Sequence, residues 1–443
     1  MQIQLSDHFS FNRLLRFTLP SIIMMIFTSI YGVVDGLFVS NFAGKTQFAA
    51  VNLIMPVIMI IGTLGFMIGT GGSAIVAKTL GEGKREKANQ YFSMLVYATM
   101  IGGIVLAVIG EFLMRPITYA LGAEGEMAQY CITYGKISLL SITPFMLQNV
   151  FQSFFVTAEK PKLGLAVVIA AGVTNMVLDY VFIAKFGWGV AGAAGATAVS
   201  EFVGGLAPIL YFGRKNSSLL KLTRCKFEWK ILRKTCTNGS SELMSNLSMS
   251  LVNMLYNFQL MRIAGEDGVA AYGVIMYVNF VFVAVFLGYS IGSAPLVAYN
   301  FGAENHAELK NVFRRSLCLI GIFGLSMLSL SELLSGTLTK FFVGYDAELY
   351  AMTCHGFRLY CLAFLINGFN IYGSAFFTAL NNGVISAVIS FLRTLVFQTI
   401  VLLVLPYFLG INGIWLSIVC AELMALAVTL TFFIKMRKRY HYA

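Results

Sequence analysis

Four oxygen-bearing side chains stand out because they lie inside long apolar stretches, where polar groups are rare. Asn175 and Asp179 are four residues apart, so on a helix they share one face. Asp35 lies in an earlier apolar stretch, and Thr197 offers a hydroxyl oxygen in a later one. Two carboxylates, an amide and a hydroxyl form an oxygen-only set that suits Na⁺, and close carboxylates also retain a proton. These residues predict a site for H⁺ or Na⁺.

The composition indicates that a membrane surrounds these residues. Of 443 residues, 58% are hydrophobic and only 12% are charged, which is too apolar for domains whose surfaces contact water. Apolar runs of about twenty residues, the length of a helix that crosses a bilayer, recur along the whole chain. We therefore expect an all-α integral membrane protein with the lipid bilayer as its surroundings.

Twelve transmembrane helices are predicted. In the first half they cover residues 14–40, 46–77, 91–113, 124–157, 161–184 and 190–213. In the second half they cover residues 234–263, 267–298, 311–333, 347–379, 384–407 and 411–435. Some of these stretches exceed the length that a bilayer requires, so we expect them to tilt or to project beyond the hydrocarbon.

The net charge of +11 has a topological meaning here and does not indicate a nucleic-acid partner. With the N-terminus inside, most Lys and Arg residues fall on the cytoplasmic side, as the positive-inside rule requires. The exceptions on the other side are Lys45, Arg115, Lys185, Arg262 and Lys340. The sequence thus predicts a multi-pass protein of the cell membrane, plasma or inner, with both termini in the cytoplasm.

An internal repeat divides the chain into two equivalent halves. Ala43-Gly44 corresponds to Ala264-Gly265 at an offset of 221 residues, and the same offset pairs Asn149 with Asn370. Six helices in each half give the halves the same orientation, as in a parallel repeat about the membrane normal. We predict two pseudo-symmetric six-helix bundles, an N-lobe at 1–213 and a C-lobe at 234–443, joined by a cytoplasmic linker at 214–233.

The repeat also sorts the acidic residues inside the predicted helices, where ionisable groups are costly. Glu111 and Glu332 are equivalent, and so are Glu201 and Glu422, which favours structural roles for these pairs. Asp35 and Asp179 instead correspond to Tyr256 and Ile400, so they exist in the first half alone. This asymmetry favours a functional role, although hydrogen bonding between neighbouring helices is an alternative. The roles of Arg358 and Arg393, also inside helices, stay open.

Other residues of the predicted helices suggest a hinge and a ligand cavity. Pro20 removes one backbone hydrogen bond from the first helix, which allows either a moving hinge or a static kink. Flexible Met and flat aromatic side chains suit hydrophobic ligands, but packing or lipid contact explains them as well. The candidate cavity residues are Tyr31, Met55, Phe145, Tyr256, Met276 and Phe280.

The sequence does not indicate an enzyme. Its four His residues form no cluster with Cys or Asp, its seven Cys residues are scattered, and no phosphate-binding glycine loop is present. We therefore expect no cofactor, and transport is the chemistry that the apolar helices and their isolated carboxylates favour.

The sequence resembles the multidrug and toxic compound extrusion (MATE) family. The resemblance covers nearly the whole chain and rests on Pro20, Asp35 at the end of Tyr31-Gly32-Val33-Val34-Asp35, the Asn175 and Asp179 pair, Thr197, Gly81-Glu82-Gly83-Lys84 and Pro295-Leu296-Val297-Ala298-Tyr299-Asn300-Phe301-Gly302. In the DinF-like branch of this family, the matching residues of the N-lobe form a cation site. The resemblance assigns that role to Asp35, Asn175, Asp179 and Thr197.

The resemblance implies a secondary active multidrug transporter that exports hydrophobic, often cationic compounds in exchange for H⁺ or Na⁺. Cation entry would bend the first helix at Pro20, and the two lobes would alternate between access states. Small drug-like molecules are the expected partners, and the protein is expected to be a monomer. A flippase for lipid-linked or polyanionic substrates is the alternative, and a channel or membrane scaffold fits less well.

Overall fold

The computed structural model describes residues 3–443, and these residues form helices joined by short turns, without a strand. The first half contains α1 (Phe11–Phe38), α2 (Lys45–Gly81), α3 (Arg85–Ala120), α4 (Gly125–Leu140), α5 (Ile142–Thr157), α6 (Pro161–Asp179) and α7 (Gly189–Gly213). The second half contains α8 (Trp229–Gly302), α9 (His306–Val343), α10 (Ala347–Cys361), α11 (Phe364–Ala379), α12 (Gly383–Phe391), α13 (Gln398–Val404), α14 (Pro406–Leu409) and α15 (Ile411–Tyr440). Three π-helical turns extend these helices, namely η1 (Val39–Ala43), η2 (Tyr180–Lys185) and η3 (Leu392–Phe397).

These helices make twelve membrane spans. Within residues 3–443, nine continuous helices are long and apolar enough to cross a bilayer, and two further spans are bent helix pairs. The longest helix, α8, has 74 residues and contains two spans, because Gly265 adopts φ 64° and ψ −151° and reverses the chain there. Only glycine reaches such a backbone conformation readily.

Two predicted spans differ from the structure because each is broken in its middle. The span at 124–157 consists of α4 and α5, which meet at 54°, and the span at 347–379 consists of α10 and α11, which meet at 48°. In the first, Pro144 has no N–H to donate to the carbonyl of Leu140, which ends the hydrogen-bond ladder. The second break lies near Leu362, the repeat equivalent of Ser141, and no proline marks it.

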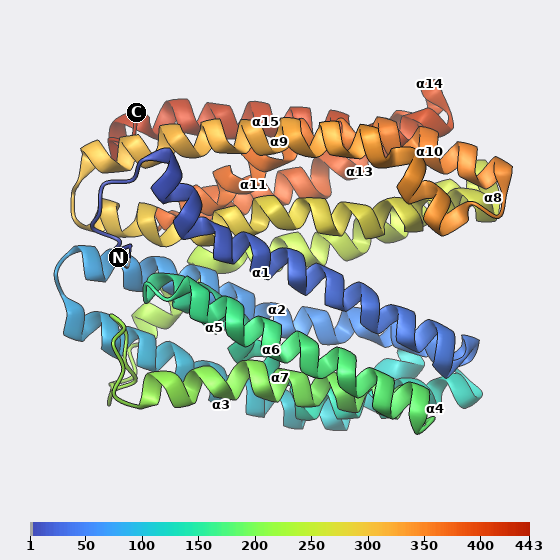
Figure 1. Ribbon diagram of the computed structural model, residues 1–443, viewed down its shortest axis with the longest axis horizontal. Helices are drawn as coiled ribbons and strands as arrows, with labels where there is room; N and C mark the ends of the chain where they lie inside the picture. The colour runs from blue at the N-terminus through green and yellow to red at the C-terminus, as the bar shows by residue number, and fades with distance from the viewer. Residues whose placement is uncertain (1–2) are drawn as a thin grey trace.

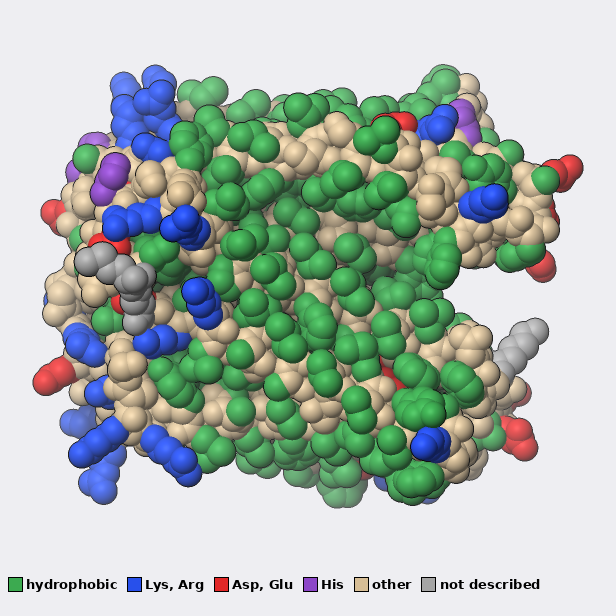
Figure 2. Space-filling view, viewed as in Figure 1, with side chains coloured by type: hydrophobic (Ala, Val, Ile, Leu, Met, Phe, Trp, Pro, Cys, Tyr) green, Lys and Arg blue, Asp and Glu red, His purple; other side chains and the backbone are tan. Residues whose placement is uncertain are grey.

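The two halves of the sequence lie side by side along the long axis of the molecule (Figure 1). Helices α1 to α7 form one side and α8 to α15 form the other, and both termini lie at the same end. Figure 2 shows Lys and Arg side chains gathered at this end, an apolar belt around the middle, and a hollow between the two halves at the opposite end. We call the end with the termini the basic end.

Glycines allow the halves to touch closely at the basic end. A side chain on Gly81, the last residue of α2, would collide with the backbone carbonyl of Tyr299 in α8. A side chain on Gly302, the last residue of α8, would collide with the carbonyl of Lys78 in α2. The offset of 221 residues relates both glycines and both of their contacts, so α2 and α8 cross symmetrically and their backbones close this end.

The segment between the halves follows the surface of α3. The backbone N–H of Lys221 donates to Asn89 Oδ1 at 2.9 Å, and that of Thr223 donates to Ser93 Oγ at 2.8 Å. Helix α8 already begins at Trp229, so the helical chain starts inside the range predicted as linker.

Candidate functional site

Asp35 and Asp179 are brought together at the ends of two neighbouring helices. Asp35 lies near the end of α1, which continues into η1, and Asp179 is the last residue of α6, directly before η2. A π-helical turn widens the helix and interrupts its regular hydrogen bonds, a feature that occurs often at functional sites. Helices α1 and α6 pack along each other, because Gly172 of α6 leaves room for the rings of Phe27 and Tyr31 of α1.

The two carboxyl groups lie within hydrogen-bonding reach of each other. Asp179 is fully buried, and within residues 3–443 no side-chain or backbone donor reaches either of its oxygens or Asp35 Oδ1. Two carboxyl groups form a hydrogen bond only when one of them carries a proton, since an ionised carboxylate has no donor. The pair is therefore a buried place for a single positive charge, supplied by a proton or by another small cation.

The predicted oxygen set is completed on the same side of α6. Asn175, which is 1% exposed, lies one turn before Asp179 and donates from Nδ2 to Thr197 Oγ1 of α7 at 3.4 Å. Asn175 Oδ1 is buried and, within the described chain, has no donor of its own. Its carbonyl oxygen is therefore free to accept a hydrogen bond or to bind a cation.

Sequence reasoning missed further polar residues that surround the pair. Glu201 of α7 interacts with Ser141 at the break between α4 and α5, and it lies close enough to Asp35 for their charges to interact. The Tyr31 hydroxyl and Gln148 of α5 also form a hydrogen bond. One signal was available in the sequence, because Glu201 follows Thr197 by four residues and so shares its helix face.

The equivalent acid of the second half has a different environment. Glu422 is fully buried, and its carboxylate accepts from Arg393 Nε of η3 at 2.7 Å and from Asn370 Nδ2 of α11 at 2.7 Å. Thr429 donates to Asn370 Oδ1 at 2.9 Å and completes the network. The second half thus carries its own fixed cation, whereas the repeat equivalent of Arg393 in the first half is Gly172.

The remaining charged residues inside spans form ion pairs nearer the surface. Lys136 Nζ lies 3.5 Å from Glu111 Oε2, and Arg358 Nε lies 3.8 Å from Glu332 Oε2. Because Glu111 and Glu332 are repeat equivalents, the same kind of pair joins the third span to the fourth in both halves. These contacts are consistent with the structural role expected from recurrence.

The six residues predicted to line a ligand cavity do not form one cluster. Met55 and Phe145 pack against the same buried cluster of the first half, and Tyr134 donates its hydroxyl to Met55 Sδ at 3.7 Å. Tyr256 is only 2% exposed and stacks on Tyr272 with ring centroids 4.8 Å apart, so it faces no open cavity.

The other predicted cavity residues, and the predicted hinge, lie elsewhere. Met276 packs at the edge of the buried cluster that contains Tyr256, and Phe280 is 43% exposed, with its carbonyl accepting from Ser29 of α1. Pro20 is buried inside α1, which runs through it as one helix. A hinge at Pro20 stays a prediction.

Two further observations concern other kinds of site. Within residues 3–443, no three His, Cys, Asp or Glu side chains come together as metal ligands. The seven Cys residues are free. A Na⁺ ion would therefore depend on the amide and hydroxyl oxygens of Asn175 and Thr197 besides the two aspartates.

Comparison with known proteins identifies the family. The MatE family model matches the chain twice, at residues 20–181 and 243–404, so each half carries one copy of the repeat. The chain therefore belongs to the MatE family, and it is a membrane transporter, not an enzyme. The multidrug export protein MepA of Staphylococcus saprophyticus is 25% identical over 426 residues, which cover 95% of this chain and 93% of that protein. MepA of Staphylococcus aureus is 25% identical over 427 residues, with the same coverage of 95% and 93%.

Solved structures share the complete fold. A crystal structure of MATE in complex with MaL6 superposes with a TM-score of 0.94 at 22% identity and covers 99% of this chain and 98% of its own. A transporter of the MOP superfamily from Pyrococcus furiosus gives a TM-score of 0.90 at 24% identity, with coverage of 98% and 97%. The arrangement of twelve spans in two bundles is thus that of the MATE transporters.

Proposed function

We propose that this protein is a proton-coupled efflux transporter of the DinF-like branch, which exports hydrophobic, often cationic drug-like compounds from the cell. The observation that carries the proposal is the buried pair of Asp35 and Asp179, two carboxyl groups in mutual hydrogen-bonding reach with no basic partner within the described chain. The relatives named as multidrug export proteins support the choice of substrate class.

The geometry of the pair favours H⁺ over Na⁺. A proton fits between two carboxyl oxygens in direct hydrogen-bonding reach, whereas Na⁺ would need the oxygens to spread around it. Each proton that moves inward along the membrane potential supplies about 2.3 kcal/mol per 100 mV. Protonation of the pair therefore provides both the energy and the local change in charge that expel a bound cationic drug.

The second half supports the assignment of coupling to the first. Glu422 is already neutralised by Arg393, a residue that keeps its charge at any physiological pH. An acid with a permanent cationic partner does not need a second cation, so Glu422 takes no part in coupling. The equivalent Glu201 has no such partner and lies beside Asp35, and we assign it an auxiliary role in holding the site's charge.

Access to the site alternates between the two sides of the membrane. The positive-inside rule assigns the basic end, with both termini, to the cytoplasm. The hollow in Figure 2 then opens to the outside, while Gly81 and Gly302 close the cytoplasmic side. Export requires a second state in which the N-lobe at 1–213 and the C-lobe at 234–443 separate at the basic end, with 214–233 as their connection.

Tyr31, Met55 and Phe145 provide the apolar surface next to the carboxyl pair, and we assign the drug to this region of the N-lobe. A polyanionic or lipid-linked substrate is less compatible with the structure. The basic residues inside spans, Lys136, Arg358 and Arg393, each lie against a carboxylate.

The test compares Asp35→Asn and Asp179→Asn with the matched control Glu332→Gln, which neutralises an acid in a surface ion pair. Each protein is reconstituted in liposomes, and export of a fluorescent cationic drug is followed under an imposed pH gradient or an imposed Na⁺ gradient. We expect both Asp variants to lose pH-driven export while the control retains it. Full export by either Asp variant contradicts the coupling site, and export driven by Na⁺ alone contradicts the proton.

A further inference from the structure

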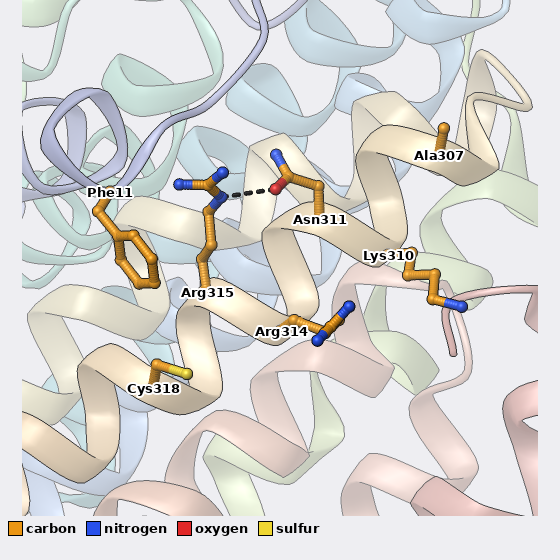
Figure 3. Close-up of a pocket in the computed structure, with 7 residues that line it drawn as sticks. All are labelled: Phe11, Ala307, Lys310, Asn311, Arg314, Arg315 and Cys318. Carbon is orange, nitrogen blue, oxygen red and sulfur yellow. Dashed lines mark hydrogen bonds between the residues drawn. The ribbon is translucent and has the colours of Figure 1, made fainter.

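A basic cavity of about 410 Å³ lies on the surface of the basic end, far from the carboxyl pair in sequence and in the fold (Figure 3). The first three turns of α9 form one wall, and the start of α1 forms the other. Its lining includes Phe11, Lys310, Asn311, Arg314, Arg315 and Cys318. Neither the transport site nor the contact between the halves uses these residues.

One of the three cations is held in place by its neighbours. Arg315 Nε donates to Asn311 Oδ1 at 2.5 Å, and the guanidinium lies over the Phe11 ring, 4.8 Å from its centroid. These contacts leave the terminal N–H groups of Arg315 available. Figure 3 shows Arg315 reaching toward Asn311, while Arg314 extends toward the side on which Lys310 lies.

The positive charge of the cavity is not balanced by nearby acids. The closest acid in sequence, Glu308, already accepts from the Phe9 N–H at 2.9 Å, from Asn311 Nδ2 at 2.8 Å and from His8 Nδ1 at 2.7 Å. In the part of the chain that the structure describes, no carboxylate oxygen lies within 4.0 Å of Lys310, Arg314 or Arg315. The cavity thus presents three cations that lack a counter-charge.

The same face of α9 becomes apolar as it enters the membrane. Cys318 follows Arg314 by one turn and is exposed, and Ile322 and Leu325 continue the stripe with 56% and 60% of their surface exposed. Residues at this spacing lie along one side of a helix. The surface therefore runs from a cationic cavity to a lipid-facing apolar stripe, which is the order of headgroup and acyl chain in a phospholipid.

We infer that this cavity binds the phosphate of an anionic phospholipid of the leaflet at the basic end, with an acyl chain along Ile322 and Leu325. Arg guanidinium groups bind phosphate oxygens in pairs, and basic pockets between membrane helices recognise anionic headgroups. The bound lipid would fix the start of α1 against α9, because Phe11 and Arg315 form opposite walls of the same cavity.

The experiment uses the full-length protein in detergent and native mass spectrometry to measure the fraction that retains added lipid. The probes are phosphatidylglycerol, phosphatidylcholine with the same acyl chains, and inorganic phosphate. We expect retention of phosphatidylglycerol alone, with roughly tenfold weaker binding in the triple variant K310Q/R314Q/R315Q. The control K221Q/R224Q/K226Q removes the same charge from exposed positions of the linker at the same end and should bind as the unmodified protein does.

Two variants and three probes make every outcome decisive. Arg314→Gln alone leaves the contact of Arg315 with Phe11 intact, so a several-fold loss in this variant separates headgroup binding from a folding defect. Equal loss in the triple variant and in the linker control assigns the effect to general surface charge and overturns the inference. Equal retention of phosphatidylcholine, or binding of inorganic phosphate as tight as that of the lipid, overturns it as well.

Discussion

The buried ion pair of the second half leads to a prediction that stability measurements can test. Arg393→Met removes the guanidinium but keeps the length of the side chain, and it leaves the fully buried Glu422 with Asn370 as its remaining side-chain donor. Removing one partner of a buried pair costs about 3 to 5 kcal/mol, because the other charge stays buried without compensation. Since the side chain of Arg393 is 17% exposed, we expect the lower end, about 3 kcal/mol.

The double variant separates this cost from a simple loss of packing. Arg393→Met with Glu422→Gln contains no buried charge, and the Gln amide still accepts from Asn370, so we expect a cost of about 1 kcal/mol. The single Glu422→Gln leaves a partly exposed guanidinium facing a neutral oxygen and should cost about 1 to 2 kcal/mol. The resulting coupling energy is about 2 to 4 kcal/mol, within or slightly above the usual range for directly contacting residues.

Unfolding in mixed micelles by titration with SDS, followed by tryptophan fluorescence, gives the free energies of unfolding. A loss of 3 kcal/mol corresponds to roughly a hundredfold change in the unfolding equilibrium constant. The control is Arg358→Met with Glu332→Gln, because this pair is 3.8 Å apart with side chains 57% and 41% exposed and should couple by less than about 1 kcal/mol. Additive effects of the two single changes at Arg393 and Glu422 would refute the reasoning.

Three further predictions concern the helix contacts and the basic end. Gly172→Leu should push α1 away from α6 and abolish pH-driven export without altering any polar residue, and export that is unchanged in liposomes would contradict this reading of the contact. Gly81→Ala should widen the closed basic end, which distances between spin labels on the loops after α2 and α8 would detect, and an unchanged distance distribution would contradict it. The hydrogen bond from Lys84 lowers the pKa of Glu82, so its stabilisation is present at neutral pH and is lost as pH falls through that lowered pKa. Glu82→Gln should therefore destabilise by less than about 1 kcal/mol at neutral pH and by less still under acid conditions, as thermal unfolding at both pH values would reveal.

Much of the fold was predictable because a bilayer restricts what a chain can do. Apolar runs of sufficient length must be helices, since every backbone polar group needs an internal partner in hydrocarbon. The turn at Gly265 was predictable as a gap between two such runs. The bends near Ser141 and Leu362 were not, because hydropathy measures the length of an apolar run but not its straightness.

The candidate site was predictable in part, for a similar reason. The absence of Asp35 and Asp179 from the second half could be read from the repeat without knowing any contact. The pairing of Arg393 with Glu422 could not, because it depends on the rotation of two helices about their axes. Recurrence alone was also misleading for Glu201, whose equivalent has a permanent partner while Glu201 itself lies in the polar surroundings of Asp35.

The repeat shows which parts of the machinery must be symmetric and which must not. Closure at the basic end uses equivalent residues, because two bundles that rock against each other meet at a common axis. Coupling needs the opposite, since two identical cation sites would compete for the same driving ion. One pair of equivalent positions makes the difference: Arg393 supplies a fixed charge to the second half, while Gly172 leaves the first half without one and lets α1 approach α6. The missing side chain thus creates both the need for an external cation and the close helix contact that brings Asp35 to Asp179.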